Sequence, residues 1–325
     1  MMRVAVKRIL ALVSVIALTV AGASGQNGAK VSGDPNDAKL ITSDIQNFWR
    51  AYDLAKPDNQ VEVFEREYLK RGSEGLQDFI KLRITSADAL VKTINKNPKY
   101  YASIRESTYR VEAMQMKIRA CFYALKYLYS DAVFPDVYFV IGRMSSGGTT
   151  SVRGLLIGTE MHGRTNRTPE DELSDWLKQV LRPIEDVPYI VAHELIHYQQ
   201  KNGAQLKTTL LYQSIKEGSA DFVAELISGG TINPHLHAYG NPKEKQLWEE
   251  FRQEMDGTNL SKWLYNGVTL KDRPADLGYY MGYKIVESYY NRMKDKRQAI
   301  KDILEFKNAA QFLKDSGYEA KFSKL

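Results

Sequence analysis

Two histidines four residues apart, with a glutamate directly after the first, constrain the fold of this chain more than any other feature. The motif is His193-Glu194-Leu195-Ile196-His197, and the apolar residues Ile190 and Val191 precede it. Residues four apart on an α-helix lie one turn apart on one face, so both imidazoles can reach one metal ion. The pattern therefore predicts a buried helix, in which zinc compensates polar groups that are costly to bury.

A third zinc ligand is expected on a second helix, because zinc sites with an open position usually have three protein ligands. Glu217 stands twenty residues after His197, in a segment with a helical apolar pattern. Asn202-Gly203 predicts a stop between the two helices, which then lie side by side. We predict one Zn²⁺ per chain, bound by His193, His197 and Glu217. Asp221, one turn beyond Glu217, is expected to accept a hydrogen bond from the second ring nitrogen of a histidine.

Other arrangements stay open on the sequence alone. The two histidines of the buried helix could be hydrogen-bonded to nearby carboxylates without a metal. His235 and His237 could supply a ligand, although their segment is predicted to be an exposed loop. His162 is expected at the surface, and Cys121, the single cysteine, is expected to be a buried helix residue.

The spacing of His193, His197, Glu217 and Asp221 resembles that of the gluzincin zinc metallopeptidases, as in thermolysin. The segments 68–76, 217–221 and 278–283 are similar to a branch of predicted zinc-dependent proteases of bacterial envelopes. The resemblance implies a zincin-like fold, a cleft between two lobes, and a peptide or protein substrate. The calcium-site clusters and the substrate-binding asparagine segment of thermolysin itself have no counterpart, which leaves the substrate class open.

In the peptidase hypothesis, zinc lowers the pKa of its bound water, and Glu194 acts as the general base. A tyrosine is the expected second donor to the oxyanion, and Tyr279 and Tyr280 are the candidates, with Tyr283 beside them. Glycines in the same segment, Gly278 and Gly282, are expected to allow this helix to approach another element closely. All three tyrosines could equally be core residues.

Two other functions stay open beside the peptidase hypothesis. One is a non-catalytic envelope protein that keeps a zinc-stabilised peptidase fold and binds partners. The other is a zinc hydrolase that acts on a non-peptide amide. The sequence leaves the oligomeric state and the choice between endopeptidase and exopeptidase action open.

The first 25 residues read as a signal peptide, with Arg3, Lys7 and Arg8 before a short apolar run and small residues at its end. We expect cleavage, a flexible leader over residues 26–37, no membrane span afterwards, and a secreted or periplasmic protein. A lipid-modified cysteine at the junction is not expected, because no cysteine lies there. Removal of three basic residues lowers the formal net charge from +6 to +3, which does not indicate a nucleic-acid partner.

The remaining pattern predicts an α+β fold that is mostly helical. Residues 38–131 are predicted to be a helical N-terminal region with one long helix over about residues 100–129. Residues 132–325 are predicted to be the zincin-like catalytic region. There, residues 137–141 and 154–158 are expected to pair as a hairpin across a flexible loop, giving a small sheet beside the histidine helix, and the C-terminal part is helical again.

Overall fold

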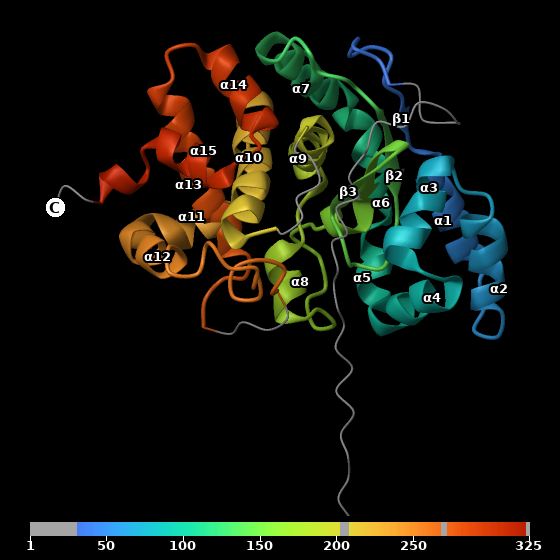
Figure 1. Ribbon diagram of the computed structural model, residues 1–325. Helices are drawn as coiled ribbons and strands as arrows, with labels where there is room; N and C mark the ends of the chain where they lie inside the picture. Colours follow the sequence, from blue (N-terminus) through green and yellow to red (C-terminus); the bar gives the residue numbers. More distant parts are fainter. Residues whose placement is uncertain (1–30, 202–207, 268–271, 323–325) are drawn as a thin grey trace, which may run out of the picture.

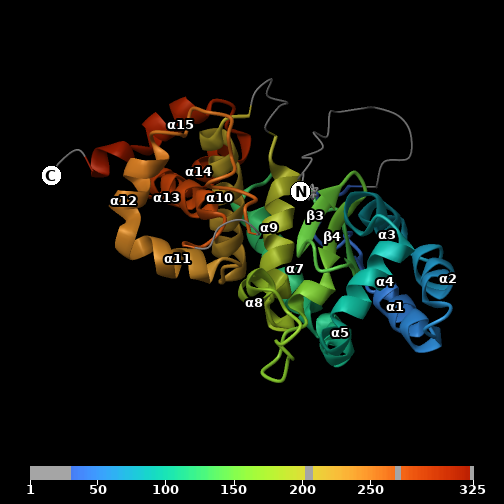
Figure 2. The same ribbon diagram turned by 90° about the horizontal axis from the view of Figure 1, so that it is seen from below.

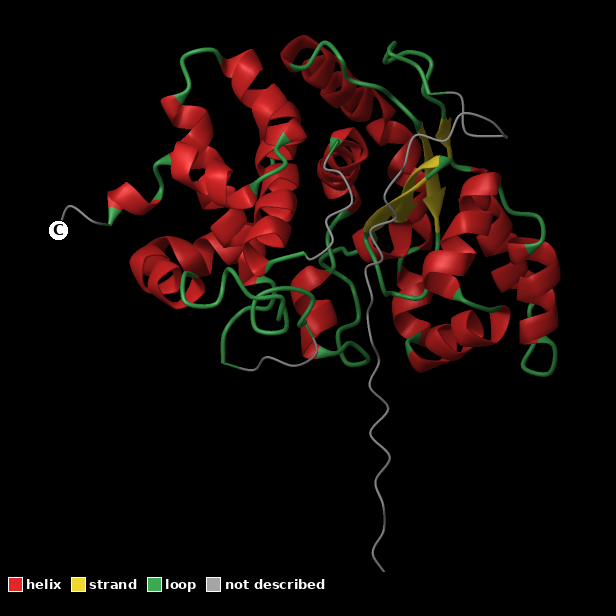
Figure 3. Ribbon diagram, in the orientation of Figure 1, coloured by secondary structure: helices red, strands yellow, loops and turns green. Residues whose placement is uncertain are grey.

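A computed structural model of the chain shows a mostly helical α+β protein with one small sheet (Figures 1 and 3). The structure describes residues 31–201, 208–267 and 272–322. The predicted signal peptide and the Asn202-Gly203 stop lie outside the described residues. The predicted fold class, α+β with a helical majority, is confirmed.

The α-helices account for most of the described residues. Their bounds are α1 Ser43–Leu54, α2 Gln60–Phe64, α3 Glu74–Phe79, α4 Ala87–Lys96, α5 Pro98–Ser103, α6 Arg105–Tyr109, α7 Gln115–Leu128, α8 Asp175–Val180, α9 Val187–Gln199, α10 Leu210–Ser228, α11 Pro234–Gly240, α12 Glu244–Phe251, α13 Leu277–Arg292, α14 Lys296–Glu305 and α15 Ala309–Ser316. Short π-helical segments are η1 Glu65–Leu69 and η2 Ile80–Ile84, and short 3-10 segments are η3 Arg110–Met114, η4 Thr159–His162, η5 Ile184–Asp186, η6 Asn241–Lys243 and η7 Glu319–Lys321.

The sheet has four strands in the order β1-β2-β4-β3. Its strands are β1 Leu40–Ile41, β2 Asp136–Val140, β3 Gly148–Ser151 and β4 Gly154–Gly158. β1, β2 and β4 run parallel, and only β3 is antiparallel, to β4. The continuous apolar runs of β2 and β4 suit strands that are buried on both faces, as parallel strands usually are.

The predicted hairpin between residues 137–141 and 154–158 is therefore wrong. These two segments do form strands, but they lie parallel, with Tyr138 opposite Leu156. The segment expected to be a flexible loop supplies β3, which forms the hairpin with β4 through a tight turn. Local pattern identified the strands, whereas their direction depends on the path of the chain between them.

The predicted long helix over residues 100–129 is also wrong, because the chain changes direction within it. It is divided into α5, α6, the 3-10 segment η3 and α7. Near its start, the Tyr100 hydroxyl donates to the Glu160 carbonyl at 2.6 Å and the Tyr101 hydroxyl to the Gly142 carbonyl at 2.8 Å. These bonds hold α5 at the end of the sheet, while α7 packs against α9 and α10. A single straight helix would not reach both places.

Helix α9 lies in the middle of the molecule, between the sheet and α10 (Figures 1 and 2). On one side it contacts β3 and β4, and on the other side it contacts α10. Helix α3 packs against β2 and β4, and α1 packs against β2. Pro188 stands in its first turn, where a missing N–H costs nothing. Residues on all sides of α9 are buried, which explains why its sequence is apolar around the motif.

Helices α10 and α13 cross with their backbones in close approach. A Cβ atom added at Gly218 would lie 2.1 Å from the Gly282 carbonyl carbon, and one added at Gly282 would lie 1.7 Å from the Ser214 carbonyl oxygen. The close approach expected from the glycines of residues 278–283 is therefore present. It brings the N-terminal end of α13 over the histidines of α9.

Of the predicted leader, residues 31–37 lie within the described part of the chain. There Ser32 forms a bridge with Phe134, whose backbone N–H donates to the Ser32 carbonyl at 2.7 Å. The predicted boundary near residue 131 falls between α7 and β2, and β1, from the N-terminal side of that boundary, pairs with β2.

Candidate metal centre

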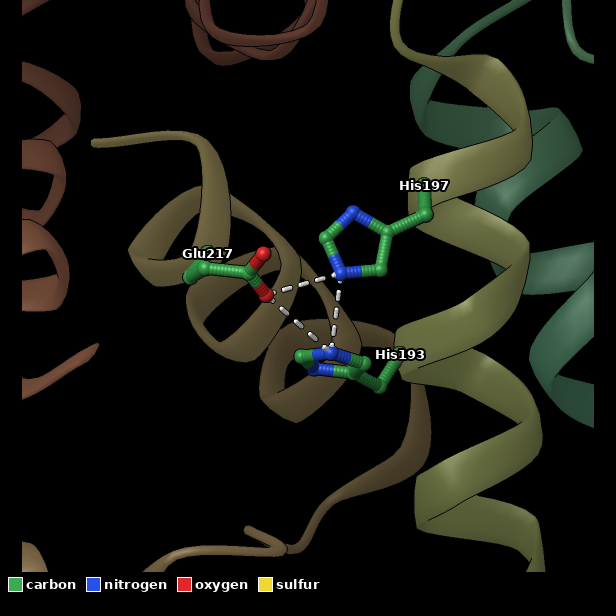
Figure 4. A group of neighbouring side chains, drawn as sticks. All are labelled: His193, His197 and Glu217. Atoms are coloured by element: carbon green, nitrogen blue, oxygen red, sulfur yellow. Dashed lines mark hydrogen bonds and ion pairs between the residues drawn. The ribbon is translucent and has the colours of Figure 1, made fainter. Parts of the chain in front are cut away.

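Three side chains predicted as zinc ligands converge at the contact between α9 and α10 (Figure 4). The His197 Nε2 atom lies 3.0 Å from His193 Nε2 and 3.0 Å from Glu217 Oε2, and His193 Nε2 lies 3.9 Å from Glu217 Oε2. Zinc bonds of about 2.0–2.2 Å place tetrahedral ligand atoms roughly 3.3 Å apart. The separations and the chemistry of the donors therefore fit a zinc ion.

Each histidine is held through its second ring nitrogen, so that Nε2 faces the common point. The His193 Nδ1 atom lies 2.8 Å from Asp221 Oδ1, and Asn233 donates to the other oxygen of Asp221 at 2.8 Å. His197 Nδ1 lies 2.9 Å from the side-chain oxygen of Gln200. Such partners fix the tautomer and the ring orientation of a metal ligand. Asp221 thus lies where the sequence places it.

Glu217 is oriented by two residues that the sequence does not single out. Its Oε1 atom accepts hydrogen bonds from Gln213 at 2.9 Å and from the Tyr265 hydroxyl at 2.8 Å, which leaves Oε2 toward the histidines. Gln213 precedes Glu217 by one helical turn, a spacing that could have indicated it. Tyr265 lies in the loop before α13 with φ at 58°, and no sequence pattern marks it.

The charged side chains of the candidate metal centre are largely buried, so their charges must compensate one another. Burial alone would lower the pKa of His193, but Asp221 outweighs it and raises the pKa to about 9. Burial would likewise raise the pKa of Glu217, yet His197 holds it below its usual range. Without a metal, a proton on His193 compensates the carboxylates; with a metal, the cation takes that place.

Glu194 lies between α9 and β3 and is not part of the metal-ligand group. It is buried, and a Cβ atom at Gly148 would lie 2.7 Å from its Cγ atom, so β3 approaches it closely. Burial raises the pKa of its carboxyl group, against the charges of His193 and His197.

Of the candidate tyrosines, only Tyr279 is brought to the centre. Its ring lies nearly parallel to that of His193, with centroids 6.3 Å apart. The Tyr280 hydroxyl donates instead to Asn241 Oδ1 at 3.2 Å, and the Tyr283 hydroxyl to Glu225 Oε2 at 3.0 Å. These two tyrosines are buried and point away from the metal ligands.

The expectations for the other histidines are corrected by the structure. His162 was expected at the surface, but its exposed fraction is 4%, because it lies in η4 beneath the loop before β3. His235 and His237 lie in α11 rather than in an exposed loop, and both are half-buried. His235 Nδ1 lies 3.1 Å from an Arg182 nitrogen, and His237 packs against the Tyr283 ring.

Cys121 is buried in α7, as expected, and its burial raises the pKa of its thiol to about 11.

A cavity of about 1210 Å³ lies along the metal centre. The two histidines, Glu217, Glu194 and Tyr279 line part of it, and β3 and the loop before β3 line another part. A fourth metal ligand could enter the centre from this cavity.

Fold and site together define a mostly helical α+β protein with a buried His-His-Glu donor set at the wall of a large cavity. A model of the protein family described as gliding motility protein GldB matches residues 30–320 of the chain. The chain belongs to this family. No curated protein and no solved structure matches it significantly.

The family assignment corrects the class predicted from the motif. The predicted membership of the gluzincin zinc metallopeptidases is wrong, because the matched family is one of gliding motility proteins and covers nearly the whole chain. The predicted hydrolysis of peptide bonds, with Glu194 as general base and a peptide substrate, is overturned by the same finding.

The label of the family marks it as a lipoprotein family, which is compatible with a location in the cell envelope. In the part of the chain that the structure describes, no helix is both long and apolar enough to span a membrane.

Proposed function

We propose that this chain is a non-catalytic protein of the cell envelope, on its periplasmic side, that binds partners and is stabilised by one zinc ion. The observation that carries the proposal is the convergence of His193, His197 and Glu217 within 4.8 Å at the cavity wall. The zincin-like fold expected from the sequence remains part of this proposal, and the position of α9 against β3 and β4 supports it.

A zinc ion at this position would join two helices that are separate in the sequence. His193 and His197 belong to α9, and Glu217 belongs to α10. Because the three donors come together only in the folded chain, metal binding adds directly to the free energy of unfolding. When bound, zinc supplies a positive charge and one open coordination position toward the cavity.

The residues of the chain do the remaining work in this proposal. Asp221 and Gln200 orient the histidines, Gln213 and Tyr265 orient Glu217, and α13 covers the centre with Tyr279. The cavity beside the centre is the surface proposed to receive a partner, because it is lined by polar and apolar side chains of both halves of the chain.

Metal analysis of the purified protein tests the proposal. We expect about one zinc per chain, lost in His197→Ala and Glu217→Gln, and retained in the matched control His237→Ala, whose histidine lies outside the donor set. A chelator should lower the melting temperature of the wild type, and added zinc should restore it. The proposal would be contradicted if the protein stayed free of zinc after expression with ample zinc and its melting temperature did not change when zinc was added. That result would favour histidines that are hydrogen-bonded to carboxylates without a metal.

A further inference from the structure

Three arginines in the wall of the cavity have no carboxylate of the described chain within ion-pair distance. They are Arg83 in η2, Arg143 just after β2, and Arg182 just before η5. None of them forms an ion pair with a described residue, whereas eight other arginines of the described chain do. Residues 1–30, 202–207, 268–271 and 323–325 contain no aspartate or glutamate that could pair with them.

The three guanidinium groups are nevertheless held in place by neutral acceptors. Arg83 donates to Thr149 Oγ1 at 3.2 Å, and Arg143 donates to the Arg83 carbonyl at 2.8 Å. Arg182 donates to the Ile232 carbonyl at 3.2 Å and lies 3.1 Å from His235 Nδ1. Burial lowers the pKa of both Arg83 and Arg182, although the charge of Glu194 opposes the shift at Arg83 and that of Asp186 opposes it at Arg182.

These cations form two separate positions along one cavity. Arg83 and Arg143 lie beside β3 and form the first position, and Arg182 lies beside α11 with His235 and forms the second. His162 lines the same cavity, and neither of its buried ring nitrogens makes a hydrogen bond of normal geometry with a described residue. The cavity wall therefore offers unused hydrogen-bond donors and positive charge at more than one place.

The carboxylates of the wall, in contrast, are mostly engaged within the chain. Glu172 accepts from the backbone N–H groups of Lys99 and Tyr100, and Asp131 pairs with Lys301. Glu217 belongs to the metal centre. Glu194 also lines the wall and attracts Arg83, although the two form no ion pair. The three arginines remain guanidinium groups of this wall without an ion pair to a described residue.

We propose that the cavity binds an acidic peptide segment of a partner protein, with one carboxylate at Arg83 and Arg143 and another at Arg182. The proposal rests on the partner-binding function proposed above and names the chemistry of the partner. A volume of about 1210 Å³ exceeds that of most small-molecule sites, about 300–1,000 Å³. Trp176, Leu177 and Val180 also line it, partly exposed, and suit the apolar side chains of a peptide better than an inorganic anion.

Binding of blocked synthetic peptides to the full chain tests this proposal. The probe is a peptide of about ten residues, long enough to span roughly 30 Å, with a glutamate near each end. Its matched control carries glutamine in both places, and inorganic phosphate serves as a competitor. We expect the glutamate peptide to bind at least about tenfold more tightly than the glutamine peptide, and more weakly as salt rises.

Protein variants locate the charges that bind the probe. Arg83→Gln and Arg182→Gln should each weaken binding about tenfold, and Arg83→Lys should restore most of it. Arg110→Gln is the matched control, because it removes the same charge from an exposed arginine that pairs with Glu185 outside the cavity. Circular dichroism and melting temperature check that each variant is folded.

Three outcomes would overturn the proposal: equal binding of the two peptides, equal losses in Arg110→Gln and the cavity variants, or displacement of the peptide by phosphate as effectively as by free glutamate peptide. The zinc content of every sample is measured as well. If the protein contains zinc but does not bind the peptide, only the proposal of an acidic partner is contradicted. If the protein contains no zinc but binds the peptide through its arginines, only the proposal of a zinc site is contradicted.

Discussion

At the scale of single residues, the histidine motif predicted two of the three side chains that converge at the candidate metal centre, because helical geometry leaves little freedom. Side chains at spacing four must share a face, so His193 and His197 converge wherever the helix packs. Asp221 followed from Glu217 by the same rule. Tyr265 lies 48 residues beyond Glu217 in the sequence, and only the path of its loop brings it there, so no periodicity could predict it.

The Asp221 carboxylate should control how tightly the centre holds zinc. Asp221→Asn keeps the size of the side chain but weakens the acceptor 2.8 Å from His193 Nδ1. We expect zinc affinity to fall roughly tenfold to a hundredfold, measured by competition with a chelator. Asp302→Asn, which changes a carboxylate bonded to Tyr289 far from the ligands, is the control and should leave the affinity unchanged.

Tyr265 provides a second test of the ligand group. Tyr265→Phe removes the hydroxyl that donates to Glu217 Oε1 at 2.8 Å but keeps the ring. One lost hydrogen bond to a charged group costs about 1.5–3 kcal/mol, so zinc affinity should drop by roughly tenfold or more. Tyr283→Phe removes a similar bond to Glu225, away from the ligands, and should keep wild-type affinity. Equal affinities in the two variants would remove Tyr265 from the centre.

At the scale of elements, the sequence predicted which segments form helices and strands better than it predicted how they pair. β2 and β4 appeared at the expected residues because β-branched and aromatic runs favour strands locally. Their parallel arrangement depends on β3 lying at the outer edge of the sheet. That position is determined by tertiary contacts and not by the local sequence. Tyr100 and Tyr101 likewise look like an ordinary apolar face, although their hydroxyls fix α5 to the sheet and interrupt the predicted long helix.

The crossing of α10 and α13 should tolerate no side chain at its contact point. Gly282→Ala places a Cβ atom 1.7 Å from the Ser214 carbonyl oxygen, so the helices must separate. Overpacking of this kind costs about 1–3 kcal/mol, and urea unfolding should show a loss of at least that size. Leu226→Ala, on the exposed side of α10, is the control and should change the free energy of unfolding by less than about 1 kcal/mol.

At the scale of the whole molecule, the motif predicted which donor side chains converge, but it did not predict the family. The coordination chemistry of a metal ion is enough to account for a His-His-Glu donor set. Unrelated chains can therefore carry the same set. Membership of the gliding motility family depends on residues 30–320 as a whole, most of which shape the helices around the centre. This is why the convergence of the three donor side chains could be predicted from the sequence, while the protein class could not.

Global stability should carry a pH dependence from Glu160, a carboxylate buried at the end of the sheet. Burial raises its pKa to about 7, although the backbone N–H groups of Gly142 and Met144 donate to it. The folded state thus binds a proton that the unfolded state releases above a pKa of about 4.5. The contribution of Glu160 to stability is therefore largest below that pH and is lost as pH rises toward 7, by about 3 kcal/mol in total.

His162, also buried, acts in the opposite direction, so the wild type alone would conceal the effect. Burial lowers its pKa to about 4, so its contribution grows as pH rises from about 4 to the unfolded value of 6.5. Glu160→Gln removes only the contribution to stability that decreases as pH rises, and it leaves the contribution of His162 in place. Between pH 4.5 and 7, its free energy of unfolding should therefore rise with pH more steeply than that of the wild type, in urea titrations at several pH values. Parallel curves for the two proteins would show that Glu160 titrates normally, whatever constant difference separates them.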